Sequence, residues 1–499
     1  MADASPESIK RLIENSEKGL SEIEISLPHV LEARQAVVEA IRNNADNDVL
    51  LDLLLVVLDT QLAENEVIYD LSSSLDALLR ADDDYTKRFY MQSLNLCFWE
   101  SSQLFVGESE EDRYGLLSRL EELTKQLNQA GCQFLTRHII DDIQAFKSIF
   151  ADRELRNITR HYDDPIKMYE KLRGLDKIDF FAKGASQLMA IRMEVTVVNS
   201  FLRSLLSPTK NRERQVISKT KKCDVYGIFN DAIFKALKER NLKKELQDIL
   251  AKGQPMLDDC YRIHQSCNKV KYYLRERDFD IPEGFHKMES IILLRMEVLY
   301  MKYDIACSVW GYLNAASDKE RSQNLRLIHI TKQAALTHIY GYNDNYREKS
   351  LWIRIKATEE ASNERLKTER VEKSLKELVS NLSEDNVNSR MYVHYRYKQE
   401  FYIPSRLDAF GKMVHYKELT DAVKLLNVCK ALEGYTVGLL SCIDEKQKQK
   451  TKQKHEEWLG TIEDLAAKMG NDEKTQKALE PLKSLVDMLY CENPCKWGI

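Results

Sequence analysis

Apolar residues recur at helical spacing along most of this chain, while residues that form tight turns are scarce. Leucines repeat every three or four positions between 116 and 127, and valines and leucines recur in the same way between 371 and 379, which places each set on one face of a helix. The 499 residues include only 17 Gly and 9 Pro, against roughly 35 and 25 at average usage. A fold of many short strands needs more of these turn residues, so we predict an all-α protein built from multi-helix bundles of long amphipathic helices.

Three stretches interrupt the helical pattern and mark candidate boundaries. Residues 207–222 combine Ser-Pro with a dense basic run, residues 381–390 are polar, and residues 445–454 alternate Lys with other polar residues. We therefore predict two or three helical domains. Their expected extents are an N-terminal helical domain over 1–206, a basic linker over 207–222, a second helical domain over 223–380 and a C-terminal helical segment over 391–499. Alternation in 390–404 allows at most one minor strand there.

Charge, apolar runs and cysteine usage narrow the class of protein. The net charge is only −5, so any binding of a polyanion must use a local basic patch. The longest apolar run, 49–58, is broken by Asp52 and is far shorter than the ~20 residues that span a membrane. The ten Cys are scattered, unlike the disulfide framework of a small secreted protein. We expect a soluble cytoplasmic protein with no membrane partner.

The motifs of several enzyme classes are missing from the sequence. It contains no Walker A loop, Rossmann glycine pattern, H-E-x-x-H or G-x-S-x-G motif. Its Cys pairs also lack the C-x2-C spacing of structural zinc sites. We therefore expect no cofactor and no metal, and find no support for a nucleotide-driven motor, a dehydrogenase, a zincin or a serine hydrolase.

One short segment, 151–165 (ADRELRNITRHYDDP), carries polar residues suited to phosphate chemistry. On a helix at ~100° per residue, its apolar residues form a narrow stripe. The opposite half of the surface carries three arginines, an asparagine and a histidine: Arg153, Arg156, Asn157, Arg160 and His161. Pro165 disfavours helical geometry at the residue before it, so the helix is expected to end just after Tyr162. The histidine then lies near a helix C-terminus, where the dipole favours a cation.

These residue types predict a metal-independent cleavage of a phosphodiester. His161 can move a proton on or off a ribose 2′-hydroxyl or a leaving 5′-oxygen. Arg156 can hold the phosphate and stabilise the charge that builds on its oxygens, and Asn157 can hydrogen-bond the phosphate or orient the imidazole. The product of such an endoribonuclease would end in a 2′,3′-cyclic phosphate. Arg153 and Arg160 are the neighbouring candidates for contacts with RNA.

The pattern Arg156-Asn157-x-x-x-His161 near the end of a helix resembles the motif of the HEPN (higher eukaryotes and prokaryotes nucleotide-binding) superfamily. That motif is an Arg followed, after four to six residues, by a His, commonly with a polar residue directly after the Arg. The resemblance covers about 90–175 and rests on this motif alone. No second copy follows, because the corresponding Arg is absent around His338, so a paired site would need a second chain.

The resemblance implies a helical bundle that forms a homodimer in which two motifs face each other. Many HEPN proteins look like metal-independent endoribonucleases of toxin–antitoxin, abortive-infection and other anti-phage systems. Other members bind nucleotides or have lost catalysis. On this basis we expect RNA as a partner, together with a homodimer or another protein partner.

The linker 207–222 is a second candidate segment for RNA binding. Its basic side chains can contact phosphates, and the residues concerned are Lys210, Arg212, Arg214, Lys221 and Lys222. The same composition is also typical of a solvated connection between domains. In 390–404, aromatic residues alternate with cations and can either stack on bases or pack this segment against the core.

The sequence is therefore compatible with two functions. The first is a HEPN-like endoribonuclease or RNA-binding protein, acting as a bacterial toxin or an anti-phage defence effector. The second is a non-catalytic helical scaffold that mediates protein–protein interaction, in which Arg156 and His161 belong to an ordinary polar helix end. The two hypotheses differ in whether these side chains converge and whether a second copy can meet them.

Overall fold

Helices are the only regular secondary structure within the residues that the computed structural model describes, which confirms the all-α prediction. The described residues are 11, 29–43, 49–107, 115–126, 130–162, 164–206, 242–276, 280–281, 283–316, 318–341, 349–361, 368–384, 415–441 and 448–489. The stretch 390–404, in which a minor strand was allowed, lies outside them. In these ranges no helix combines the length and apolar character that a membrane crossing requires.

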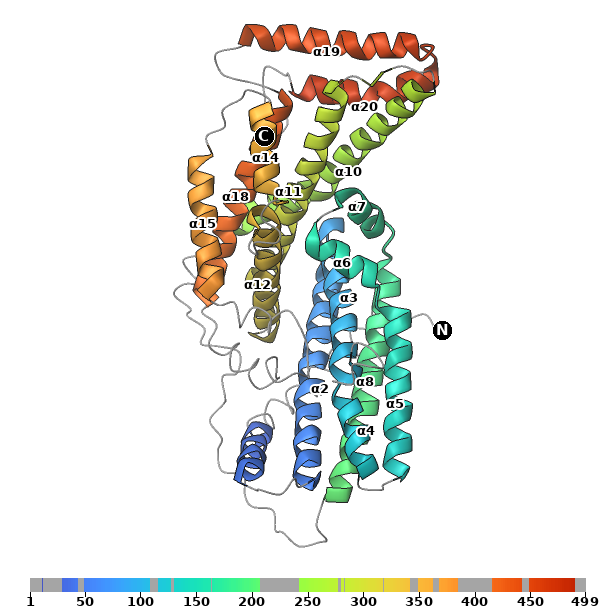
Figure 1. Ribbon diagram of the computed structural model, residues 1–499, viewed down its shortest axis with the longest axis vertical. Coiled ribbons are helices and arrows are strands. Elements are labelled where there is room, and N and C mark those ends of the chain that lie inside the picture. The colour runs from blue at the N-terminus through green and yellow to red at the C-terminus, as the bar shows by residue number, and fades with distance from the viewer. Residues whose placement is uncertain are drawn as a thin grey trace.

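Helices from the first part of the chain pack side by side as one unit, the N-terminal bundle, in the lower part of Figure 1. Its helices are α2 (Val49–Arg80), α3 (Asp84–Val106), α4 (Leu116–Gln126), α5 (Ala130–Phe150) and α8 (Lys177–Leu206). The predicted leucine stripe faces its core, because Leu116, Leu120 and Leu123 are no more than 1% exposed. A further helix over 29–43 is tied to α2 by the ion pair between Arg34 and Asp59, 2.7 Å apart.

A second unit, the C-terminal bundle, occupies the upper part of Figure 1. Its helices are α10 (Leu242–Arg275), α11 (Glu283–Asn314), α12 (Asp318–Tyr340), α14 (Leu351–Ala361), α15 (Glu369–Glu384) and α18 (His415–Ser441). Helix α11 is central, since α10, α12 and α18 all pack against it. Helices α19 (Lys448–Lys468) and α20 (Glu473–Leu489) cross the top of the view, and α20 contacts α10.

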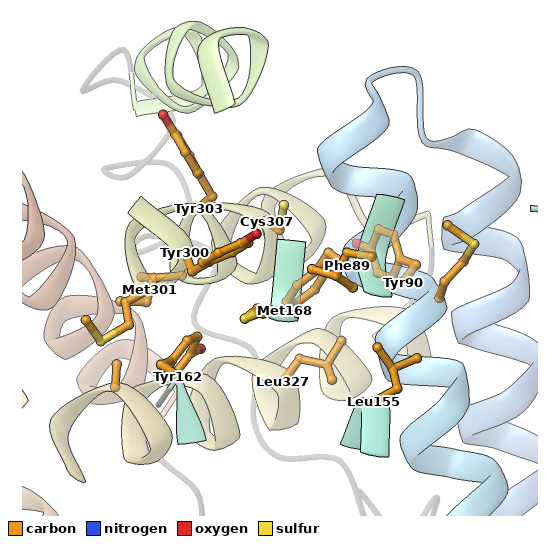
Figure 2. Packing of buried hydrophobic residues seen from close by; sticks show 14 of the residues in the cluster. Phe89, Tyr90, Leu155, Tyr162, Met168, Tyr300, Met301, Tyr303, Cys307 and Leu327 are labelled. Carbon is orange, nitrogen blue, oxygen red and sulfur yellow. The ribbon is translucent and has the colours of Figure 1, made fainter. Parts of the chain in front are cut away.

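Two short helices lie at the junction, the region where the two bundles meet. Helix α6 (Arg153–His161) packs against α3 and α12, and helix α7 (Pro165–Arg173) packs against α10 and α11. Figure 2 shows side chains of α3, α6, α7, α11 and α12 interleaved there. The buried hydrophobic residues of the described chain form one connected cluster that runs through both bundles. The candidate motif is therefore held between two packed bodies rather than on an isolated helix.

Charged residues inside the protein cross-link helices of the two bundles. Asp70 on α2 pairs with Arg326 on α12, and both side chains are buried. Within the C-terminal bundle, buried Glu418 accepts from Lys332 at 2.6 Å and lies 3.2 Å from a ring nitrogen of His329. Burying a charge is costly unless its partner lies within hydrogen-bonding distance. Any shift of α12 that separates these pairs is therefore unfavourable, and the pairs fix the position of α12 against α2 and α18.

The predicted domain boundaries stay predictions, because the linker 207–222 lies outside the described residues. Within those residues, α15 continues to Glu384, a few positions into the expected break at 381–390. Helix α18, which belongs to the expected C-terminal segment, packs against α11 and α12.

Candidate functional site

Helix α6 begins and ends on local signals in the sequence. The side chain of Asp152 caps its N-terminus by accepting from the Leu155 backbone N–H at 2.9 Å, which satisfies one of the donors that a helix leaves open. The helix ends at His161, and Tyr162 adopts a left-handed conformation with φ 55° while its N–H donates to the Ile158 carbonyl at 3.3 Å. Pro165 opens α7 directly afterwards. The stop lies within one residue of the expected position.

Tyr162 fixes the C-terminal end of α6 to the junction. Its side chain is 2% exposed, and its phenol donates to Asp304 Oδ2 at 2.8 Å. The phenol of Tyr85, from α3, donates to the other oxygen of the same carboxylate at 2.8 Å. A left-handed conformation costs a non-glycine residue about 1–2 kcal/mol, and this buried contact offsets that cost. His161, one residue earlier, is therefore presented at a defined place.

Arg156 is anchored on the inner side of α6. Its guanidinium donates to Glu100 Oε1 at 2.9 Å and to Asn157 Oδ1 at 3.2 Å. The Glu100 side chain is fully buried, whereas Arg156 is 20% exposed. Arg156 and Tyr162 also line one small cavity of about 30 Å³, room for about one water molecule. Arg156 thus combines an ion pair to a buried carboxylate with a side chain that is partly exposed to solvent.

His161 and Asn157 are exposed on α6. In the described part of the chain, no hydrogen bond or ion pair joins the His161 imidazole to the Arg156 guanidinium, as their separation of about 140° around the helix leads one to expect. Arg153 is also exposed, and the side chain of Arg160 lies outside the described part of the structure. Asp164 does not pair with His161 here; its carboxylate caps α7 by accepting from the Lys167 N–H at 2.9 Å.

Two residues of α3 also belong to this site, and they were not predicted from the sequence. Glu100 holds Arg156, and the indole of its neighbour Trp99 lies beneath three cations contributed by α5 and α6. Neither residue forms a motif with 151–165, because they precede it by more than fifty positions. The only signal in the sequence was an acidic residue directly after the apolar run Leu96–Trp99.

A second polar cluster, formed by His338, Glu297 and Arg354, lies next to Tyr162. The ring of His338 is 5.8 Å from that of Tyr162, centroid to centroid. His338 Nε2 lies 2.7 Å from Glu297 Oε2 and 3.4 Å from Nη2 of Arg354. The other terminal nitrogen of Arg354, Nη1, donates to Glu297 Oε1 at 2.9 Å. The sequence around His338 contains no matching arginine, and the structure brings one from α14.

The remaining predicted contacts cannot be placed. The basic linker residues Lys210, Arg212, Arg214, Lys221 and Lys222 lie outside the described residues, as does 390–404. Among the described residues, no group of three or more His, Cys, Asp or Glu side chains is arranged to hold a metal ion. Burial raises the pKa of the Cys267 thiol to about 12, so this thiol is not a nucleophile near neutral pH.

Comparisons with known proteins reveal no relative. No protein-family model matches the chain, no curated protein matches it, and neither does any solved structure.

Proposed function

We propose that the chain is a HEPN-like, metal-independent endoribonuclease or RNA-binding protein that acts as a bacterial toxin or an anti-phage defence effector. The observation that carries this proposal is the presentation of His161. The histidine is exposed at the end of α6, while Arg156 and Tyr162 on either side of it are fixed by buried partners. An exposed imidazole whose neighbouring residues are held in place by buried partners is suited to proton transfer with a bound substrate.

In the proposed reaction, His161 acts first as a general base. Its imidazole takes the proton of a ribose 2′-hydroxyl as the 2′-oxygen attacks the adjacent phosphorus. The P–O2′ bond forms, the P–O5′ bond breaks, and the chain leaves a 2′,3′-cyclic phosphate on one fragment. The leaving 5′-oxygen takes a proton from the histidine of a second copy, which is the reason to propose a homodimer.

Arg156 contributes the positive charge that stabilises the phosphate in the transition state. Its guanidinium has five N–H donors, and the bonds to Glu100 and Asn157 use two of them. Because Glu100 holds the group in place, little side-chain entropy is lost when one of the remaining terminal N–H donors meets a phosphate oxygen. In this mechanism the substrate links Arg156 to His161, so no direct contact between the two side chains is required.

The alternative proposal is a non-catalytic helical scaffold that mediates protein–protein interaction. The observation in its favour is the same ion pair, because an arginine held by a fully buried carboxylate also serves simply to attach α6 to α3. On this proposal the exposed His161 imidazole contacts only water, and its loss has no effect on RNA.

Expression in a bacterial host separates the two proposals. Wild type and His161→Ala are induced to equal levels and scored for growth and for the integrity of cellular RNA. The matched control is His138→Ala, since His138 on α5 is also exposed, with 65% of its side chain accessible. The nuclease proposal expects growth arrest and RNA fragmentation with wild type and His138→Ala, and relief of both with His161→Ala. Equal growth and intact RNA in all three strains favour the scaffold.

A further inference from the structure

We propose that Trp99, Lys147 and Arg153 form a binding surface for single-stranded RNA beside Arg156. This inference rests on the proposed function, since it names how the same site holds its substrate. The surface draws on three helices: Trp99 from α3, Lys147 from α5, and Arg153 and Arg156 from α6.

The cations gather around one aromatic ring. Lys147 Nζ lies 4.7 Å from the centroid of the Trp99 ring, and the guanidinium carbons of Arg156 and Arg153 lie 5.7 Å and 5.9 Å from it. All three distances fall within the ~6 Å range of a cation–π contact. One such contact is common in proteins, whereas here three cationic groups surround one partly exposed indole. The charge of Arg156 is balanced by Glu100, so Arg153 and Lys147 are the cations that the surface adds beside it.

The charge of Arg153 is not neutralised by its neighbours. The carboxylates on either side of it in the sequence, Asp152 and Glu154, are directed to α7: Glu154 pairs with Lys167 and with Lys171 at 2.5 Å each, and Asp152 pairs with Lys171 at 3.4 Å. Hydrogen bonds from Lys167 and Lys171 hold the pKa of Glu154 at about 2. In the described part of the chain, exposed Arg153 forms no ion pair, so its donors are open to an anionic ligand.

The chemistry of this surface matches a single strand of RNA. The contacts with the indole hold the guanidinium groups of Arg153 and Arg156 close to one another, and guanidinium N–H groups are the donors that phosphate oxygens accept most readily. An unpaired base can also stack on the part of the Trp99 ring that the cations leave exposed. Bases inside an A-form duplex are already stacked and cannot reach it. The surface therefore selects single-stranded substrate and delivers a phosphodiester to Arg156.

Fluorescence anisotropy with the full-length protein tests this surface. The probe is a short, labelled 2′-O-methyl oligoribonucleotide, which lacks the nucleophilic hydroxyl and so reports binding without cleavage. The test variant is Arg153→Glu. The control is Arg137→Glu, an equal change in charge at an exposed position of α5. We expect Arg153→Glu to weaken binding at least tenfold and to flatten its dependence on salt concentration, while Arg137→Glu stays within twofold of wild type.

Two further arms make the test specific. Trp99→Leu, which keeps an apolar side chain but removes the ring, is expected to weaken binding severalfold, and a duplex of the same sequence is expected to compete poorly. Equal affinities for Arg153→Glu and Arg137→Glu, equal competition by duplex, or no binding by wild type would overturn the inference. Wild-type binding that Arg153→Glu abolishes, without cleavage of unmodified RNA by any variant, would support this surface and refute only the nuclease proposal.

Discussion

Removing the guanidinium of Arg156 should destabilise the protein by far more than removing a surface arginine. In Arg156→Met the apolar stem is kept, but the fully buried Glu100 carboxylate loses the donor 2.9 Å away. Deleting one partner of a buried ion pair costs about 3–5 kcal/mol. Because Arg156 is itself 20% exposed, solvent screens part of this interaction, and we expect about 3 kcal/mol.

Urea unfolding followed by circular dichroism measures this loss of free energy. The control is Arg262→Met, which removes an exposed arginine paired with Asp259 within α10, a contact worth about 0–1 kcal/mol. The double variant Glu100→Gln/Arg156→Met should regain a large part of the loss, since it no longer buries a charge without its partner. If Arg156→Met is no more destabilising than Arg262→Met, the account of α6 as a helix anchored through Glu100 is wrong.

Two other predictions concern the scaffold. Burial alone would raise the pKa of Glu418, but the hydrogen bond from His329 and the nearby cations outweigh burial and hold that pKa at about 2. Because this value lies below the ordinary 4.5, ionised Glu418 stabilises the folded protein fully above about pH 4.5, and this stabilisation is lost as the pH falls toward 2. Glu418→Gln should therefore cost about 3 kcal/mol at pH 7, and a gap to wild type in unfolding experiments that does not narrow below pH 4.5 would contradict this. A Cβ at Gly311 would overlap Asn324 Oδ1 and the Tyr90 hydroxyl, whereas a Cβ at Gly434 would meet nothing within 4 Å. In thermal unfolding, Gly311→Ala should destabilise by about 1–3 kcal/mol and Gly434→Ala should stabilise by about 0.5–1 kcal/mol; equal effects would argue against the close packing at Gly311.

The motif helix could be predicted because its determinants are local. Leu155 and Tyr162, placed on one apolar stripe by helical spacing, are 0% and 2% exposed. The stop before Pro165 follows from the steric effect of proline on the residue before it. The all-α fold was likewise fixed by spacing and by the scarcity of turn residues, which are properties that any window of the sequence contains.

The partners of the polar side chains could not be predicted, because they come from distant helices. Glu100 lies 56 positions before Arg156, and Arg354 reaches His338 from a different helix. A search at helical spacing covers only neighbours three or four positions away, so it found no arginine near His338. Packing of α3, α6, α12 and α14 at the junction creates these contacts, and a single sequence carries no direct signal of that packing.

The proposal that His161 cleaves RNA without a metal ion is best tested by a cleavage assay with purified protein. Unstructured RNA is incubated in EDTA with wild type, His161→Ala or His138→Ala, and the ends of the fragments are analysed. We expect wild type and His138→Ala to release fragments ending in 2′,3′-cyclic phosphate. His161→Ala should retain its helicity and lose this activity by at least a hundredfold, about the least that a general acid–base group contributes. Wild-type protein that leaves RNA intact while dimeric, or His161→Ala that cleaves as fast as wild type, would contradict it.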